Sequence, residues 1–383
     1  MSNSSDPSAI SEASLALLKG LIEAPSPSGY EQPVQEFLRG SCRAFCGQIE
    51  TDVMGNVYLS LPGSGGAPSV MLAGHCDEIG FLVTYVHPGG YIYFDPVGGH
   101  DANITVGQRV LVHTAEHGAL HGVVGKKPIH VLTEEERGRK TQISELFIDI
   151  GALDGAKIDE IVRIGDPITY AAGFERLRGD LAASHAFDNK IGVFVVAETL
   201  RLLAERGGCK ASVTGVSTVQ EEIGHRGART AAHKVDSAIG IAIDVGHATD
   251  YPGADKRHIG DVRLGGGPEI TRGANVNPEV FRRLVAAAEA EAVPFQVVAR
   301  PAATRTDAAD LQVSRDGMAA ALISIPLRYM HTPCEVIHLA DAVNTARLLA
   351  RFIADLDDSC DLTPSLANLP SPKLPLRRGE AKE

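Results

Sequence analysis

The pattern of apolar residues and glycines changes twice along the chain, and this change constrains the fold more than any other feature. Between Ile79 and about Ala171 it consists of short β-type runs separated by glycine, with helical periodicity only near Thr133–Lys140 and Asp154–Val162. From Asp188 onward, helical and strand patterns alternate, which is typical of a layered α/β sheet. The β-type stretch therefore predicts a separate module that interrupts an α/β domain.

The α/β part contains apolar runs with the spacing of helices and of buried strands. The expected helices cover Ser11–Leu21, Val34–Phe45, Ile191–Ala204, Gly227–Ala232, Pro278–Ala292 and Ala340–Ile353. The expected strands cover Val57–Leu61, which follows a hairpin turn at Gly55-Asn56, and Ser69–Ala73, Ser212–Val219, Ala238–Asp244, Phe295–Ala299 and Ala321–Pro326. We expect residues 1–76 and 174–362 to form one split domain and residues 77–173 to form the β-rich insert. Residues 363–383, rich in Pro, Lys, Arg and Ser, predict a mobile C-terminal tail.

Composition excludes several classes of protein. With 44% hydrophobic and 22% charged residues, the 383-residue chain is predicted to be a folded soluble protein. Its net charge of −12 argues against nucleic-acid binding, because an acidic surface repels phosphates. No apolar run approaches the roughly 20 residues that span a bilayer, so we expect no membrane association. The polar N-terminus does not resemble a secretory signal, and the six scattered cysteines suit reduced thiols, so a cytoplasmic location is expected.

Polar side chains gather where the predicted strands end. His75 follows one strand, Glu221-Glu222 follows a second, Asp244 ends a third and His331 follows a fourth, while Asp188 lies at the start of a helix. Functional groups of α/β sheets collect beyond the carboxyl ends of the strands. We therefore expect two histidines and several carboxylates to converge on one spot.

Imidazole nitrogens and carboxylate oxygens are ligands that Zn²⁺, Co²⁺ or Mn²⁺ accept at hydrolytic sites. Asp77, two residues after His75, is expected to accept the other ring N–H of that histidine. Neighbours on an extended segment point in different directions, so one of Glu221 and Glu222 can bind metal while the other carries protons. Taken singly, each residue can also be explained by a role in the fold without metal, such as a helix cap at Asp188 or a solvated charged pair at Glu221-Glu222. His247 and Asp250 are rival ligands.

Other catalytic patterns are missing or incomplete. The sequence contains no Gly-x-Ser-x-Gly elbow, which disfavours a serine hydrolase. The glycines at 265–267 are not followed by Lys-Ser/Thr, so they do not form a phosphate-binding loop. Adjacent Glu221 and Glu222 are poorly placed to flank the glycosidic bond of a sugar.

The chain resembles the M42 family of metalloaminopeptidases, which includes the tetrahedral glutamyl, leucyl and lysyl aminopeptidases. Among the stretches that carry the resemblance are AGHCDEIGF, SHAFDNKIGV, STVQEEIGHRGA, AIDVGHATDYPG, TDAADLQVSRDG and ISIPLRYMHTP, in the order of the family. The resemblance implies a mixed-sheet α/β/α di-metal exopeptidase domain interrupted by a PDZ-like dimerisation domain. It also implies self-association into dimers and into a tetrahedral dodecamer.

The resemblance assigns a metal-binding role to five residues. Asp188 would bridge two divalent ions, Zn, Co or Mn, and the peptide after it is typically cis in the family. His75 and Asp244 would complete the shell of one ion. Glu222 and His331 would complete the shell of the other.

The resemblance further implies a mechanism. Glu221 would take a proton from a metal-bridging water, the hydroxide would attack the peptide carbonyl, and Glu221 would protonate the leaving amine. Asp77 would support His75, and the substrates would be short peptides with a free α-amine. Two alternatives are a di-metal deacylase or amidohydrolase on the same scaffold and a non-catalytic metal-bound assembly. The sequence departs from the family at His225 and Arg305, and a cationic Arg305 in the pocket would favour acidic N-terminal residues.

Overall fold

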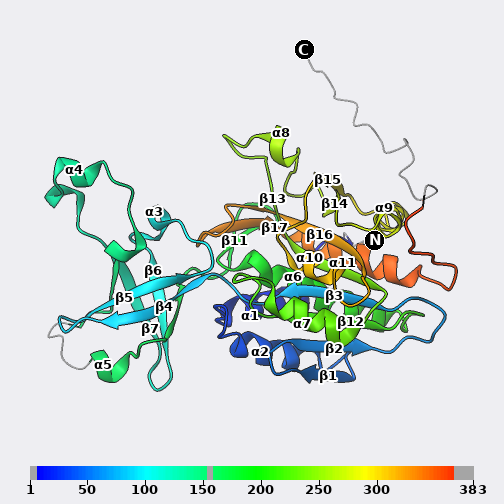
Figure 1. Cartoon of the computed structure of the whole chain (residues 1–383), viewed down its shortest axis with the longest axis horizontal. Coiled ribbons are helices and arrows are strands. Elements are labelled where there is room, and N and C mark those ends of the chain that lie inside the picture. Colours follow the sequence, from blue (N-terminus) through cyan, green and yellow to red (C-terminus); the bar gives the residue numbers. More distant parts are fainter. Residues whose placement is uncertain (1–6, 153–157, 366–383) are drawn as a thin grey trace, which may run out of the picture.

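The larger domain is built around an 11-stranded mixed sheet, seen in a computed structural model that describes residues 7–152 and 158–365 (Figure 1). At its centre β12, β3, β13 and β16 lie side by side in parallel, so their carboxyl ends share one edge. The strands are β1 (Gln48–Thr51), β2 (Val57–Leu61), β3 (Val70–His75), β10 (Glu175–Arg176), β11 (Leu181–Ser184), β12 (Val213–Thr218), β13 (Ile239–His247), β14 (Glu269–Gly273), β15 (Gln296–Arg300), β16 (Ala319–Arg328) and β17 (Glu335–His338).

Helices cover both faces of this sheet. One face carries α1 (Glu12–Glu23), α2 (Gln32–Cys42), α6 (Phe187–Glu205), α9 (Pro278–Ala290) and α11 (Leu339–Ala354), and the other carries α7 (Arg226–Val235) and α10 (Asp307–Gln312). Successive residues of a strand point to opposite faces, and β3 shows the result. Val70 and Leu72 pack in the core under α1, α6 and α11, whereas Met71 and Ala73 pack in the core under α7 and α10. The expected α/β/α arrangement is confirmed.

The β-type stretch folds into a small closed barrel of antiparallel strands with a core of its own, in which Phe81, Ile92 and Val110 are buried. Its strands are β4 (Gly80–Val86), β5 (Tyr91–Val97), β6 (Arg109–Thr114), β7 (Gly118–Gly125), β8 (Phe147–Asp149) and β9 (Pro167–Tyr170). The short helices of this region are α3 (Ala102–Thr105), η1 (Ile129–Val131), α4 (Glu134–Arg137), η2 (Ile143–Glu145) and α5 (Ile158–Ile161). Figure 1 shows the barrel projecting from one end of the larger domain. The expected separate β-rich domain is therefore present.

The structure adds elements that the patterns did not predict. The short strands β10, β11, β14 and β17 and the helices α10 and α8 (Lys256–Ile259) have too few residues for a clear period. In the hairpin before β2, the first strand is β1, and the N–H groups of Met54, Gly55 and Asn56 hold the turn by donating to Oδ1 of Asp52. Residues 366–383 of the predicted tail, and residues 153–157, lie outside the described residues, and the domain boundaries at 77 and 173 stay predictions. Among the helices that are described, none combines the length and apolar character that crossing a bilayer requires.

Candidate metal centre

The predicted site residues reach one cavity at the carboxyl edge of the central strands. β3 ends at His75, Asp244 lies on β13, and His331 follows β16. The cavity has a volume of about 650 Å³. Six of the seven predicted site residues line it, namely His75, Asp188, Glu221, Glu222, Asp244 and His331. Convergence of the strand ends, rather than any local motif, therefore creates the site.

The start of α6 is pressed against the end of β3. A side-chain carbon on Gly74 would lie only 2.7 Å from the carbonyl carbon of Gly192, and one on Gly192 would lie 2.7 Å from the carbonyl oxygen of Ile243, so both positions depend on the absence of a side chain. The amide of Asn189 donates to the carbonyl oxygen of Ile243 on β13 at 2.8 Å. The peptide between Asp188 and Asn189 is cis, as the family resemblance implies. These contacts bring the carboxylate of Asp188 next to His75.

Within the described residues, two groups of side chains offer ligand atoms that all lie within 4.8 Å of one another. In the first group, Nε2 of His75 lies 3.4 Å from Oδ1 of Asp188 and 3.7 Å from Oδ1 of Asp244. In the second, Nε2 of His331 lies 3.4 Å from Oδ2 of Asp188 and 3.5 Å from Oε1 of Glu222. Asp188 belongs to both groups and turns a different oxygen toward each.

These separations fit ligands around an ion better than hydrogen bonds. A direct N–H···O bond is about 2.7–3.2 Å long. Two ligand atoms that each lie about 2.1 Å from a tetrahedral zinc ion are about 3.4 Å apart. The N···O distances of 3.4–3.7 Å in both groups match the second value. Together with the imidazole and carboxylate chemistry, this geometry fits divalent cations.

The electrostatics of the site also fit cations. Burial, and then the charge of Asp188, raises the pKa of Glu222 well above its usual range. Burial likewise raises the pKa of Asp244 to about 6. Asp188 differs, because His331 and His75 hold its pKa far below the usual range in spite of its burial. Crowded, buried carboxylates that resist ionisation are stabilised in their charged form by a cation among them.

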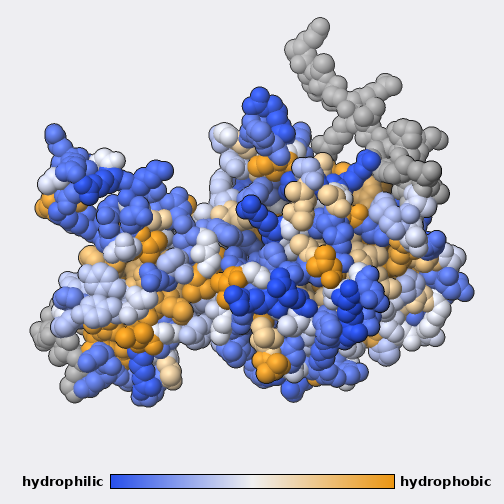
Figure 2. Space-filling view, in the orientation of Figure 1, coloured by the Kyte–Doolittle hydropathy of each residue, from blue (hydrophilic) through white to orange (hydrophobic). Residues whose placement is uncertain are grey.

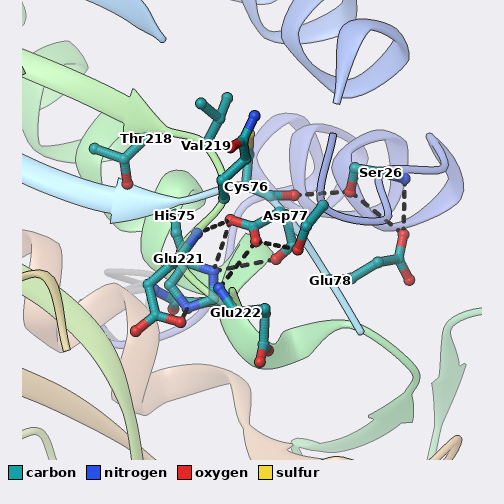
Figure 3. A network of polar contacts seen from close by, with 12 residues as sticks. Ser26, His75, Cys76, Asp77, Glu78, Thr218, Val219, Glu221 and Glu222 are labelled. Atoms are coloured by element: carbon teal, nitrogen blue, oxygen red, sulfur yellow. Dashed lines mark hydrogen bonds and ion pairs between the residues drawn. The ribbon is translucent and has the colours of Figure 1, made fainter. Parts of the chain in front are cut away.

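Asp77 lies behind the cavity and organises the segment that carries the two glutamates (Figure 3). Its Oδ1 accepts the N–H of Glu221 at 2.9 Å, and its Oδ2 accepts the N–H of Glu222 at 3.1 Å and the hydroxyl of Ser28 at 2.6 Å. Nδ1 of His75 is nearer to the carbonyl oxygen of Asp77, at 3.1 Å, than to its Oδ1, at 3.5 Å. Asp77 thus supports the histidine chiefly through its backbone and the glutamates through its carboxylate.

The two adjacent glutamates turn apart. Oε1 of Glu222 lies 3.5 Å from Nε2 of His331, in the second ligand group. Oε2 of Glu221 lies 3.7 Å from Nε2 of His75. Glu221 belongs to neither ligand group and lines the cavity beside the first. Its carboxylate is thus positioned to exchange protons with a molecule in the cavity.

One supporting residue, Glu335, was not found by sequence reasoning. The buried carboxylate of Glu335 accepts the N–H of Asp188 and the N–H of His331, each at 3.0 Å, and so fixes the backbone of two predicted ligands. No motif links Glu335 to Asp188, because the two meet only through tertiary structure. Of the rival ligands, Asp250 binds Arg328 at 2.6 and 2.7 Å, and His247 lines the cavity but belongs to neither group.

Comparisons with known proteins agree with this architecture. The profile of the M42 glutamyl aminopeptidase family matches residues 55–348. Lysyl aminopeptidase of Pyrococcus furiosus is 35% identical over 91% of this chain and 99% of its own length.

Solved structures agree as well. The aminopeptidase APDkam598 of Desulfurococcus kamchatkensis is 34% identical with a TM-score of 0.84, covering 90% of this chain and 96% of the other. The TET1 peptidase of Pyrococcus horikoshii is 28% identical with a TM-score of 0.79, covering 90% of this chain and 100% of the other. With a family match across most of its length and a two-domain fold in common with solved aminopeptidases, the chain belongs to the M42 family of aminopeptidases.

Proposed function

We propose that the protein removes N-terminal residues from short peptides with two divalent ions, held by the two ligand groups, and with Glu221 as general base and acid. The observation that carries this proposal is that Glu221 and both ligand groups face one cavity. Asp188 would contribute one oxygen to each ion. His75 and Asp244 would complete the first shell, and Glu222 and His331 the second.

Bound divalent cations supply Lewis acidity, which polarises a peptide carbonyl and makes a water molecule more acidic. The chain's own residues do the remaining work. Glu221 accepts the proton of the attacking water at Oε2, the oxygen that faces His75, and then delivers a proton to the leaving amine. Asp77 keeps this carboxylate in place through the backbone N–H of Glu221. Glu221 returns to its ionised form when it gives up the proton that it has taken, so one carboxylate can serve both steps.

The proposed activity is tested with the full chain stripped of metal and then supplied with Zn²⁺, Co²⁺ or Mn²⁺. Release of free amino acids is measured from a panel of dipeptides, each in an unblocked and an N-acetylated form. We expect metal-dependent cleavage of the unblocked set alone. Cleavage of the acetylated set would instead support a deacylase, and no cleavage with any metal would support a non-catalytic metal-bound assembly.

Two arginines of the cavity predict a preference for acidic N-terminal residues. Arg300 ends β15 and Arg305 precedes α10, and within the described part of the chain neither guanidinium has an ion-pair or hydrogen-bond partner. A hydrogen bond to a charged group contributes about 1.5–3 kcal/mol. We therefore expect Arg300→Ala and Arg305→Ala each to lower kcat/KM for Glu-p-nitroanilide, relative to Ala-p-nitroanilide, about tenfold.

The control for these variants is Arg176→Ala, which removes an exposed arginine that does not line the cavity. It should leave the ratio of the two substrates unchanged. Equal kcat/KM of the unaltered protein on Glu- and Lys-p-nitroanilide would contradict the predicted preference.

We also propose that the chain assembles through its barrel domain into dimers and a tetrahedral dodecamer. Apolar side chains gather on the barrel in Figure 2, and six of its exposed residues are large hydrophobics, namely Tyr85, Tyr91, Val123, Ile129, Val131 and Ile164. Exposed patches of this kind mark interaction surfaces. The related TET1 peptidase is described as able to assemble into a tetrahedron or a large octahedral shell. Light scattering from a monomer at micromolar concentration would contradict this assembly.

A further inference from the structure

A histidine bridges the proposed general base to a second carboxylate on the far side of the cavity wall. Nε2 of His225 lies 3.3 Å from Oε1 of Glu221, and Nδ1 of His225 lies 3.0 Å from Oδ2 of Asp310. His225 lines the cavity, but it belongs to neither ligand group. The imidazole therefore contacts Glu221 without competing for the ions.

Asp310 and Arg229 hold this imidazole on the side that faces away from Glu221. Asp310 lies on α10, and its Oδ1 accepts the Nε–H of Arg229, on α7, at 3.0 Å and forms an ion pair with Nη2 of the same arginine at 3.0 Å. The helices α7 and α10 pack against each other on the same face of the sheet. Arg229, Asp310, His225 and Glu221 thus form a continuous chain of polar contacts that ends at the cavity.

The backbone of His225 is tied to the same glutamate. Its N–H donates to the carbonyl oxygen of Glu221 at 3.0 Å, and the N–H of Arg226 donates to the carbonyl oxygen of Gln220 at 3.2 Å. His225 adopts a left-handed conformation, with φ of 53°, immediately before α7. This turn folds the imidazole back over the side chain of Glu221.

The two oxygens of Glu221 consequently face different partners. Oε1 faces His225, and Oε2 faces Nε2 of His75 at 3.7 Å. We propose that His225 is a positioning residue, which holds Oε1 of Glu221 so that Oε2 points at the reacting water. This inference rests on the proposed role of Glu221.

The protonation of the imidazole is consistent with that role. The contact with Glu221, against the effect of burial, raises the pKa of His225 to about 9. Both ring nitrogens then carry hydrogen at neutral pH, so Nδ1 can donate to Oδ2 of Asp310 while Nε2 forms an ion pair with Oε1 of Glu221. A carboxylate attracted by an opposite charge at this distance has less freedom to rotate away from its productive orientation.

The test measures kcat, KM and bound metal for His225→Asn in the metal-loaded, full-length protein. Asn tolerates the left-handed backbone, so this variant removes the imidazole without adding backbone strain. Misplacement of a catalytic group by about 1 Å can cost 100-fold. We expect kcat to fall about 10- to 100-fold, with KM and metal content unchanged. Asp310→Asn, which can still accept from Nδ1, should cause a smaller loss.

A matched control is His233→Asn, which makes the same change at an exposed position on α7 and should leave kcat unaltered. In a background of Glu221→Gln, His225→Asn should cause no further loss of kcat, because the group it positions is already gone. A kcat of His225→Asn within twofold of the unaltered protein, a loss explained by missing metal, or a rise in KM alone would overturn the inference. Failure of the proposed function would show differently, as inactivity of the unaltered protein on every unblocked peptide.

Discussion

Replacement of Glu221 by Gln should lower kcat at least about 100-fold, because general acid–base catalysis contributes about 10²–10⁴ in rate. The amide has the shape of the carboxylate but cannot accept the proton of the attacking water. Because Glu221 belongs to neither ligand group, both ions should remain bound. The measurement is kcat on an unblocked dipeptide together with the metal content of the purified variant.

The adjacent residue provides the matched control. Glu222 lies one position away and is held by the same carboxylate of Asp77, but it turns toward His331. Glu222→Gln should therefore lose metal, whereas Glu221→Gln should lose rate and keep metal. Unchanged turnover of Glu221→Gln, or the same loss of metal in both variants, would show that Glu221 is not the base.

The strand-end rule predicted that these side chains converge, because it depends on topology. β12 and β3 are parallel neighbours with Thr218 opposite His75, so the residues that follow each strand must meet. The same pairing explains what the sequence could not reveal about Asp77. Its carboxylate receives the N–H groups of Glu221 and Glu222, a contact between segments whose adjacency depends on the strand order. Alternation along one strand predicts only neighbours within that strand.

The start of α6 shows a second limit. Apolar spacing predicts a helix from Ile191. In the structure α6 begins at Phe187, and the backbone of Asp188 and Asn189 within it is not helical. That departure orients the carboxylate shared by the two ligand groups, and no local propensity accounts for it. Two hydrogen bonds hold this non-helical backbone in place. The N–H of Asp188 donates to the carboxylate of Glu335, and the side-chain amide of Asn189 donates to the carbonyl oxygen of Ile243 on β13. Such tertiary hydrogen bonds have no periodic signature in a sequence, so the contacts that support the site are harder to predict than the residues at the strand ends.

Replacement of Asp188 by Ala should remove both ions, whereas replacement of a residue from one group should remove one. The reason is geometric, since Oδ1 of Asp188 faces His75 and Oδ2 faces His331. Loss of a supporting residue alone typically weakens metal binding about 10- to 100-fold, so loss of a shared ligand should weaken it at least about 100-fold. Asp244→Asn and His331→Asn should each retain one ion. The measurement is the number of ions per chain after dialysis against a fixed free concentration of Zn²⁺.

The fold of Asp188→Ala should be preserved, because the contact with Glu335 uses the backbone N–H and not the side chain. In the metal-free parent, His75 and His331 favour the charged form of Asp188, so loss of this carboxylate removes stabilising contacts. The thermal midpoint of the metal-free variant should therefore lie at or below that of the metal-free parent, and added Zn²⁺ should no longer raise it. Asp95→Ala, an exposed change on β5 of the barrel, serves as the control and should keep both ions and the Zn²⁺-dependent rise. One ion retained by Asp188→Ala would mean that the two groups bind independently, and the shared carboxylate would then not be a bridge.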